Sequence, residues 1–444
     1  MAQEINKRWY VVRAISGKEK KVKEYIEMEV DRMKMTDYVS QILIPTEKVF
    51  QIRNGKKVSK ERNFFPGYVL IEASLVGEVP HVIKNVPNVI GFLGGEKGGE
   101  PMPLRQTEVN RILGKVDELA VETIYFGGGT PSQLETRELN TIIDCVKQHY
   151  NVSEKPEITV ESNPDNLSRD YLQSLYNIGV NRLSIGIQSF KNEDLELMNR
   201  AHNCKEAEQC VSIARGVGFK NLSIDLIYGL PNSSLKDWKS NIKKALKLNP
   251  EHISAYNLTI EKGTPLAHSV AKGRVNIPSD EEIVMQHNTL VSSLNTAGFE
   301  HYETSNFAKK GYRSQHNSSY WKGTHYVGFG PSAHSFNGNS RSWNIANTKK
   351  YVDSMRKGKS YSETEILSEI DSINEFILTG LRTVEGINLQ HFRSNFGEKA
   401  DEQLMKESQS SISKGLLEKT ENRLAITSTG KVLLDGVTAE LFFE

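Results

Sequence analysis

Cysteine is scarce in this sequence: only Cys145, Cys204 and Cys210 occur among 444 residues. So few cysteines at such irregular spacing exclude a disulfide framework and agree with a reducing compartment. Long hydrophobic runs are also missing, since no apolar segment approaches the roughly 18 residues that a membrane span needs. The N-terminus, MAQEINKRWYVV, lacks the charged-then-apolar order of a secretory signal. We therefore expect a cytoplasmic protein.

Neither sign of charge dominates, because the formal net charge is +1. The 37% hydrophobic and 25% charged content is typical of globular protein, and the length predicts two or three domains. The charge is nevertheless uneven, since residues 1–120 hold 20 lysines and arginines against 16 acidic residues. The basic excess lies at the front of the chain.

The first 120 residues combine strand-like runs with one amphipathic segment, which predicts an α+β domain with an antiparallel sheet. Within it, RNGKKVSKER predicts an exposed, positively charged hairpin that could approach nucleic acid or an acidic protein surface. The alternative is a solvated edge that protects a strand from aggregation. The basic residues of this hairpin flank an Asn-Gly turn at residues 54–55 and are Arg53, Lys56, Lys57, Lys60 and Arg62.

Three segments of this front part, WYVVRAISGKEKKVKEYI, IPTEKV and FFPGYVLIEA, resemble the N-terminal (NGN) domain of the transcription elongation factor NusG. The resemblance covers residues 1–118 as a domain and implies binding to the clamp helices of RNA polymerase through an apolar patch. Phe65 and Tyr68 would lie at that patch, or else both fill the domain core. NusG continues into a KOW domain, whereas here KVDELA runs directly into VETIYFGGGTP.

From Val121 onward strand-like and helical segments alternate, which predicts an α/β fold with a parallel sheet, either open or rolled into a barrel. The predicted strands are ETIYFGG, EITVES, RLSIGIQS, LSIDLIYG, HISAYNLTI and EHYETSNF. Sites in such folds collect at the carboxyl ends of the strands. Polar residues and glycines stand at those ends here, where they would suit a nucleoside or an amino-acid-bearing ligand. The alternative for each is a helix cap or a loop hydrogen bond.

The segments YFGGGTPS, ESNPDNLS, NRLSIGIQSF, LMNRAH and DLIYGLP resemble radical-SAM enzymes related to oxygen-independent coproporphyrinogen III oxidase, and HNSSYW points to their HemW-like branch. The resemblance implies a partial (β/α) barrel over residues 121–362 and a winged-helix-like C-terminal domain over 363–444. It also implies S-adenosylmethionine (SAM) binding by Gly128, Gly129, Thr130, Glu161, Gln188, Arg200 and Asp225.

The HNSSYW segment places His316 and Asn317 close to Tyr320 and Trp321. A histidine in a polar loop between aromatic residues could ligate heme iron while the aromatics cover the porphyrin. The resemblance implies the same, because HemW-like proteins are thought to bind and deliver heme. The alternative is a hydrogen-bonded loop histidine beside a structural tryptophan. His334 is a second candidate ligand.

What the family needs and this sequence lacks is the C-x3-C-x2-C motif whose three thiolates hold a 4Fe-4S cluster. NusG-like sequence stands in its place. Cys145 is expected on the apolar side of a helix, in the core. Cys204 and Cys210 supply two thiolates where three are needed. We therefore predict that no such cluster forms and that SAM is not cleaved.

The missing first barrel strand also predicts an unprotected sheet edge beside ETIYFGG. The segment EVNRILGKVDEL, with one apolar face, could occupy the vacant position. Farther on, the last 80 residues predict two helices, a small β-wing and a final helix, without the basic cluster that DNA binding would need.

Three functions remain open on these grounds. The first is a heme-binding, HemW-like protein without SAM cleavage, joined to a NusG-like domain. The second is a polymerase-binding module whose rear part is a passenger. The third, an active coproporphyrinogen oxidase-like enzyme, is disfavoured by the absent cysteines. The abrupt passage near residue 120 indicates a chimera, made by rearrangement, by assembly error or by design.

Overall fold

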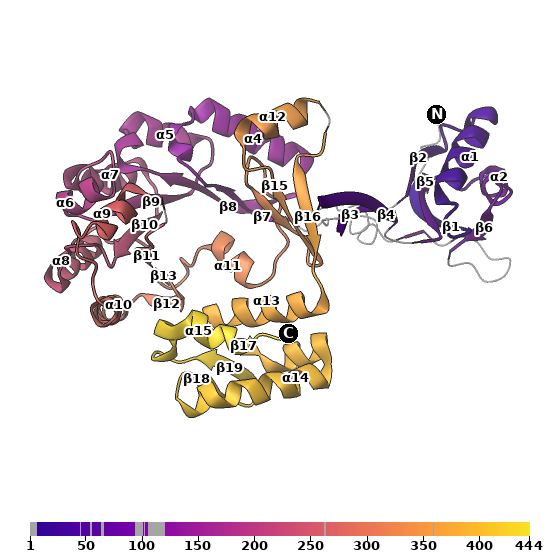
Figure 1. The fold of residues 1–444 in the computed structure, drawn as a ribbon. Coiled ribbons are helices and arrows are strands. Elements are labelled where there is room, and N and C mark those ends of the chain that lie inside the picture. The colour runs from indigo at the N-terminus through magenta and orange to yellow at the C-terminus, as the bar shows by residue number, and fades with distance from the viewer. Residues whose placement is uncertain are drawn as a thin grey trace. The chain divides into compact units, whose positions relative to one another are not determined.

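The computed structural model describes residues 7–44, 46–53, 56–63, 66–93, 101, 103–104, 120–261, 263–357 and 359–444, with the backbone alone for 46–53 and 56–63. The chain divides into two compact units (Figure 1): residues 1–119 with 325–366, and residues 120–324 with 367–444. No helix in the described ranges is long and apolar enough to cross a membrane.

The front of the smaller unit is an antiparallel sheet in the order β2-β5-β1-β6, with helices packed on one face. Its elements are β1 (Arg8–Ala14), α1 (Glu19–Arg32), β2 (Val39–Leu43), β5 (Tyr68–Ala73), α2 (Val79–Lys84) and β6 (Val89–Phe92). Alternate residues of β5 point to opposite faces. Val69 and Ile71 join the core beneath the helices, whereas Tyr68 and Leu70 lie on the other face with Trp9. The α+β prediction is confirmed.

The predicted basic hairpin forms β3 (Thr46–Arg53) and β4 (Lys56–Asn63), which pair antiparallel from Thr46↔Asn63 to Arg53↔Lys56. Its Asn-Gly turn, the basic side chains and Phe65 lie outside what the structure describes, as does the EVNRILGKVDEL segment. The same unit contains a three-stranded antiparallel sheet, formed by β14 (His334–Phe336), β15 (Ser340–Asn344) and β16 (Ser362–Ile366), and the helix α12 (Thr348–Arg356).

The larger unit is built on a curved seven-stranded sheet in the order β12-β13-β11-β10-β9-β8-β7. Its strands are β7 (Val121–Phe126), β8 (Val152–Ser162), β9 (Arg182–Gln188), β10 (Asn221–Tyr228), β11 (His252–Asn257), β12 (Glu300–Glu303) and β13 (Asn306–Ala308). Strands β7 to β11 are parallel, and β7 is the edge strand among the described residues. The prediction of one strand for EHYETSNF is wrong, because Thr304 and Ser305 turn the chain back and the run forms an antiparallel pair.

Helices cover the outer face of this sheet (Figure 1). Buried polar side chains of its strands, such as Thr159 and Ser223, lie on the inner face. Odd and even residues of a strand face opposite sides, so Leu183, Ile185 and Ile187 of β9 enter the core and Arg182 and Ser184 face inward. The larger helices of this layer are α4 (Thr136–His149), α5 (Arg169–Asn177), α7 (Cys204–Val217), α8 (Leu235–Lys247) and α10 (Asp280–Thr296). The shorter ones are η1 (Pro131–Gln133), η2 (Pro164–Asn166), α6 (Asn192–Leu197) and α9 (Pro265–Ala271).

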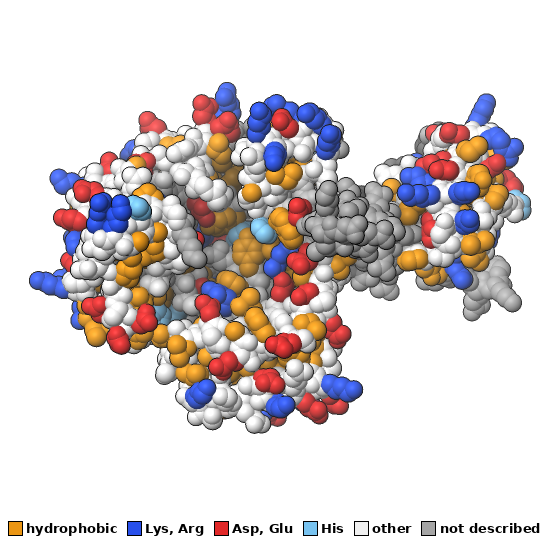
Figure 2. Space-filling model, viewed as in Figure 1, with side chains coloured by type: hydrophobic (Ala, Val, Ile, Leu, Met, Phe, Trp, Pro, Cys, Tyr) orange, Lys and Arg blue, Asp and Glu red, His pale blue; other side chains and the backbone are white. Residues whose placement is uncertain are grey.

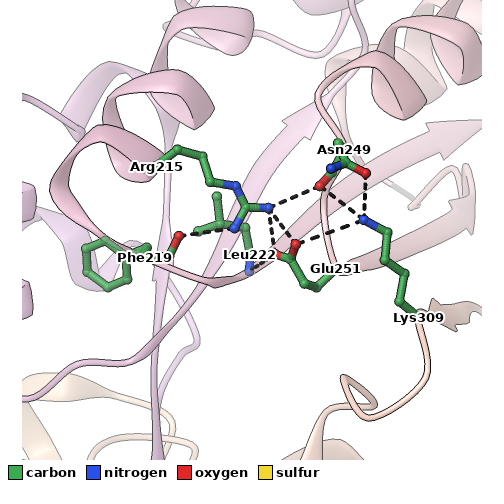
Figure 3. Close-up of polar contacts among 6 residues, drawn as sticks. All are labelled: Arg215, Phe219, Leu222, Asn249, Glu251 and Lys309. Carbon is green, nitrogen blue, oxygen red and sulfur yellow. Dashed lines mark hydrogen bonds and ion pairs between the residues drawn. The ribbon is translucent and has the colours of Figure 1, made fainter.

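A buried ion pair holds the amino-terminal side of β10 and β11 together (Figure 3). Glu251, 8% exposed, precedes β11 and accepts two hydrogen bonds from Arg215 of α7, at 2.8 and 2.6 Å. It also accepts from the Leu222 backbone N–H at 3.1 Å. Arg215 donates further to the carbonyls of Phe219 and Asn249, both at 3.1 Å. Helix α7 and both strands are therefore tied at one point.

The C-terminal segment forms the predicted pair of helices, small wing and final helix, around a core of its own. Its elements are α13 (Glu369–Arg382), β17 (Ile387–Asn388), α14 (Leu389–Ser413), β18 (Leu417–Lys419), β19 (Arg423–Ile426), η3 (Gly430–Leu433) and α15 (Leu434–Ala439). The wing is a sheet in the order β17-β19-β18. Gly397 (φ 85°) kinks α14 by leaving the helical region, which a glycine does at little cost.

Candidate functional site

The turn after β7 consists of glycines whose backbone lies against Glu161 of β8. Gly128 and Gly129 have φ of 72° and 101°, a region that favours glycine. The Gly128 N–H donates to Glu161 at 3.1 Å. A Cβ on Gly127 would lie 2.5 Å from the Tyr125 ring and 2.8 Å from a Glu161 carboxylate oxygen. The turn therefore requires glycine where the sequence provides it, and Thr130 leads from it into η1.

Acidic and phenolic groups face each other beside this turn. Tyr125 donates to Glu161 at 2.7 Å, and burial together with that carboxylate raises the pKa of Tyr125. Asp225, in the middle of β10, accepts from Ser184 at 3.4 Å. Burial, and secondarily Glu161, raises the pKa of Asp225 to about 6. Asp225 therefore keeps its proton up to a higher pH than an ordinary aspartate does, but it is mostly ionised at pH 7.

Arg200 reaches the ends of β8 and β9 and is bound there by protein groups. Its Nη2 donates to Asn163 Oδ1 at 2.7 Å and to the Gly186 carbonyl at 3.0 Å. Gln188 closes β9 with φ of 65°, and a Cβ on Gly186 would lie 2.9 Å from the Gln188 amide nitrogen. Most of the residues expected to hold SAM stand at or beside the carboxyl ends of β7 to β9, and Arg200 reaches the ends of β8 and β9. Asp225 is the exception, because it lies within β10.

The cysteines do not form a cluster site. Cys204 and Cys210 lie six residues apart on α7, about 9 Å along the axis and about 240° around it. Cys210 is buried, its thiol donates to the Ala207 carbonyl, and burial raises its pKa to about 12. Across the described ranges, no group of three His, Cys, Asp or Glu side chains could hold a metal ion. The residues present do not fit a 4Fe-4S cluster.

The prediction that Cys145 lies in the core is wrong, because its side chain is exposed on α4. That helix buries Leu139 and Ile143. Cys145 follows Ile143 by two residues, which places it about 200° around the helix, on the opposite side. It lies 59 residues before Cys204 in the sequence.

The HNSSYW segment is a helix, α11 (Gln315–Trp321), and not the predicted loop. The Ser314 hydroxyl caps its first turn by accepting from the Asn317 N–H at 3.3 Å. Helix α11 lies on the inner side of the sheet (Figure 1), where it contacts β7. Figure 2 shows this side of the larger unit hollowed, with hydrophobic, acidic and histidine side chains in its walls.

His316 is held on three sides. Its ring stacks on Tyr125 with centroids 4.5 Å apart and planes 13° apart. Its Nδ1 lies 2.8 Å from Thr123 Oγ1, and its Nε2 lies 2.9 Å from the Tyr320 hydroxyl. Burial, and secondarily Arg182, lowers the pKa of His316 to about 4, so the imidazole is neutral at pH 7. A neutral imidazole is the form that ligates metals.

Of the other motif residues on α11, Tyr320 contacts this histidine, whereas Trp321 packs against α13. Tyr320 is 38% exposed and forms the solvent side of the helix. Trp321 packs against the Arg382 guanidinium of α13, 5.0 Å from the ring centroid. Its indole N–H is buried without a hydrogen-bond partner among the described residues. His334, the second candidate ligand, lies on β14 in the smaller unit.

Sequence reasoning missed Thr123, Glu157 and Arg182, the inward-facing residues of β7, β8 and β9 that adjoin His316. Glu157 accepts from the backbone N–H groups of Gln315 and His316 at 3.2 and 3.1 Å. The sequence pattern that could have identified them is the alternation of these polar residues with Ile124, Ile158 and Leu183 in otherwise apolar strands.

Three family models match the chain: transcription termination factor NusG over residues 7–113, the radical SAM superfamily over 85–245 and the HemN C-terminal domain over 367–433. Among solved structures, coproporphyrinogen III oxidase (HemN) of Escherichia coli is similar with a TM-score of 0.63 and 22% identity, over 73% of this chain and 78% of that one. At this identity the likeness shows the fold, a radical-SAM half-barrel.

The curated relatives decide the branch. The heme chaperone HemW of Bacillus subtilis is 34% identical over 344 residues, 77% of this chain and 91% of that protein. HemW of Escherichia coli is 32% identical over 379 residues, 83% of this chain and 92% of that protein. Together with the HNSSYW helix and the strand-end residues, these matches show that the chain belongs to the HemW family of radical-SAM proteins and carries a NusG-type domain at its front.

Proposed function

We propose that this protein binds heme as cargo through α11, with His316 Nε2 as the ligand to iron. The observation that supports this most strongly is a neutral imidazole, fixed on Tyr125 and Thr123, whose second nitrogen faces the half-exposed Tyr320. Relatives that match over nine tenths of their length are heme chaperones by name. The Tyr320 hydroxyl leaves Nε2 when iron binds, and its ring then covers one side of the porphyrin, with Asn317 and Trp321 on the same helix.

We further propose that this protein does not cleave SAM. The carboxyl groups of Glu161 and Asp225 can accept hydrogen bonds from an amino group and from ribose hydroxyls. Cleavage needs an electron from an iron–sulfur cluster, and the thiols of this chain do not fit one. Heme binding is therefore the function that the described residues support, and coproporphyrinogen oxidation is not.

Hemin titration of the full chain tests the proposal. The wild type is expected to shift the Soret band at a stoichiometry of one hemin per chain, and His316→Ala is expected to weaken this binding. His334→Ala, which alters the other candidate, provides the matched control. If His334→Ala weakens binding and His316→Ala does not, the proposed ligand is wrong.

The front domain supports a second function, docking to the clamp helices of RNA polymerase. Tyr68 is partly buried at the edge of a small cluster on the sheet face away from α1 and α2, where Trp9, Val11 and Leu70 are buried. Copurification of polymerase with the full chain should fall for Tyr68→Ala. Tyr25→Ala on α1, where the tyrosine is 37% exposed, is the control that should leave it unchanged.

A further inference from the structure

Thr123 and Glu157 meet His316 from one position of the sheet. The two residues are direct partners in the register of β7 and β8. Thr123 contacts the imidazole ring at Nδ1, 2.8 Å away, and Glu157 accepts from the backbone N–H of the same histidine at 3.1 Å. Tyr125, two residues beyond Thr123 and on the same face of β7, stacks on the ring. Residues of β7 and β8, at the edge of one sheet, therefore fix the position of the His316 ring, the orientation of its plane and the backbone of this residue.

The hydrogen bonds at the two ring nitrogens have a preferred direction. A neutral imidazole has one N–H donor and one acceptor nitrogen. A phenol, with a pKa near 10, is a far stronger hydrogen-bond donor than the aliphatic hydroxyl of threonine. With Tyr320 as the donor at Nε2, Thr123 Oγ1 is the acceptor that an Nδ1–H requires, so the two contacts together favour this tautomer. The lone pair is left on Nε2, on the side of Tyr320.

We infer that Thr123 and Glu157 are positioning residues, which select Nε2 of His316 as the iron-binding nitrogen and hold α11 so that this nitrogen points away from the sheet. The inference deepens the proposed function and rests on it for the identity of the cargo. In metal sites the hydrogen bond to the other ring nitrogen sets both the tautomer and the orientation of the histidine. Glu157 adds to this because its two oxygens bind the first two N–H groups of α11 separately, at 3.2 and 3.1 Å.

The test begins without heme. Nitrogen-15 NMR of histidine-labelled full-length protein, with His316→Ala to assign the signal, should show His316 protonated at Nδ1. Thr123→Val keeps the side-chain shape and removes the acceptor, so the signal should change to a mixture of tautomers. Thr123→Ser should restore the wild-type signal. Thr159→Val is the matched control, because Thr159 faces inward on β8 and its hydroxyl has no hydrogen-bond partner among the described residues.

Hemin titration of the same variants completes the test. Thr123→Val should weaken hemin binding about 10-fold or more, the range typical for loss of a hydrogen bond behind a metal-bound histidine. Thr123→Ser should recover most of the affinity, Glu157→Gln should lie between, and Thr159→Val should match the wild type. A wild-type His316 protonated at Nε2, or a Thr123→Val variant that behaves as Thr159→Val in both measurements, would overturn the inference.

Failure of the two proposals is distinguishable. If His316→Ala binds hemin as tightly as the wild type, heme ligation by His316 is wrong, and the NMR measurement alone then decides whether Thr123 sets the tautomer. If His316→Ala loses hemin and Thr123→Val does not, heme ligation stands and the positioning role is refuted.

Discussion

Removing the Arg215 guanidinium should destabilise the half of the sheet that carries Asp225. In Arg215→Met the Glu251 carboxylate, 8% exposed, would keep only the Leu222 N–H at 3.1 Å and Lys309 at 4.0 Å (Figure 3). Loss of one partner of a fully buried pair costs about 3–5 kcal/mol. Because the Arg215 side chain is 31% exposed, water offsets part of that cost, and we expect about 2–4 kcal/mol.

Hydrogen exchange measured by mass spectrometry on peptides of β10 and β11 gives the opening free energy of these strands. A loss of about 2–4 kcal/mol corresponds to exchange about 30- to 900-fold faster, at 1.36 kcal/mol per tenfold. Arg137→Met is the matched control, since its pair with Glu135 at 3.2 Å has side chains 82% and 71% exposed. That control should change stability by less than about 0.5 kcal/mol.

A double variant separates burial from simple loss of contact. In Arg215→Met combined with Glu251→Gln the unpaired buried charge disappears, so about 1 kcal/mol or more should return relative to Arg215→Met alone. If Arg215→Met and Arg137→Met accelerate exchange equally, or if the double variant is worse than the sum of both changes, the reasoning about buried charge is refuted.

Anaerobic iron–sulfide reconstitution should leave no stoichiometric iron–sulfur absorbance, and SAM under reducing conditions should yield no 5′-deoxyadenosine. A stoichiometric cluster or the formation of 5′-deoxyadenosine would contradict the prediction that these cysteines hold no 4Fe-4S cluster. Burial, and secondarily Lys431, lowers the pKa of His301 to about 3, so the unfolded chain takes up a proton that the folded one does not and stability falls as pH drops below 6.5. His301→Phe should remove about 2 kcal/mol of the loss between pH 7 and pH 5 in urea unfolding, and an unchanged pH dependence would show that other groups cause it. Gly127→Ala should lower the opening free energy measured by hydrogen exchange on β7 peptides by about 1–3 kcal/mol, because the new methyl group would overlap Tyr125 and Glu161. An unchanged opening free energy would show that the turn can rearrange to accept the methyl group.

Local patterns were enough to predict most strands and helices of the larger unit. Apolar runs bounded by glycine or asparagine became β7 to β11, because a strand buried on its outer face needs that composition. The same patterns located Glu161 and Gln188 at strand ends, since parallel strands bring their carboxyl ends to one edge. The prediction of a single strand at residues 300–307 was wrong because a two-residue turn in a polar stretch resembles a continuous strand.

Side-chain direction was harder to predict. Cys145 stands next to apolar residues in sequence but about 200° from Ile143 around its helix, so neighbourhood was a poor guide to burial. His316 was read as a loop residue because serine and asparagine are abundant around it. Ser314 and Glu157 instead cap a helix there, and Glu157 is distant in sequence.

The sequence by itself determined the two kinds of domain, the α/β order of the larger unit and the shortage of thiols, because periodicity, turn residues and composition are local properties. Tertiary structure alone decided that His316 lies on Thr123 and Tyr125, and that its backbone is held by Glu157. The physical reason is that the pairing register of β7 and β8, together with the packing of α11 against them, joins residues nearly 200 positions apart, and no local pattern records such a contact.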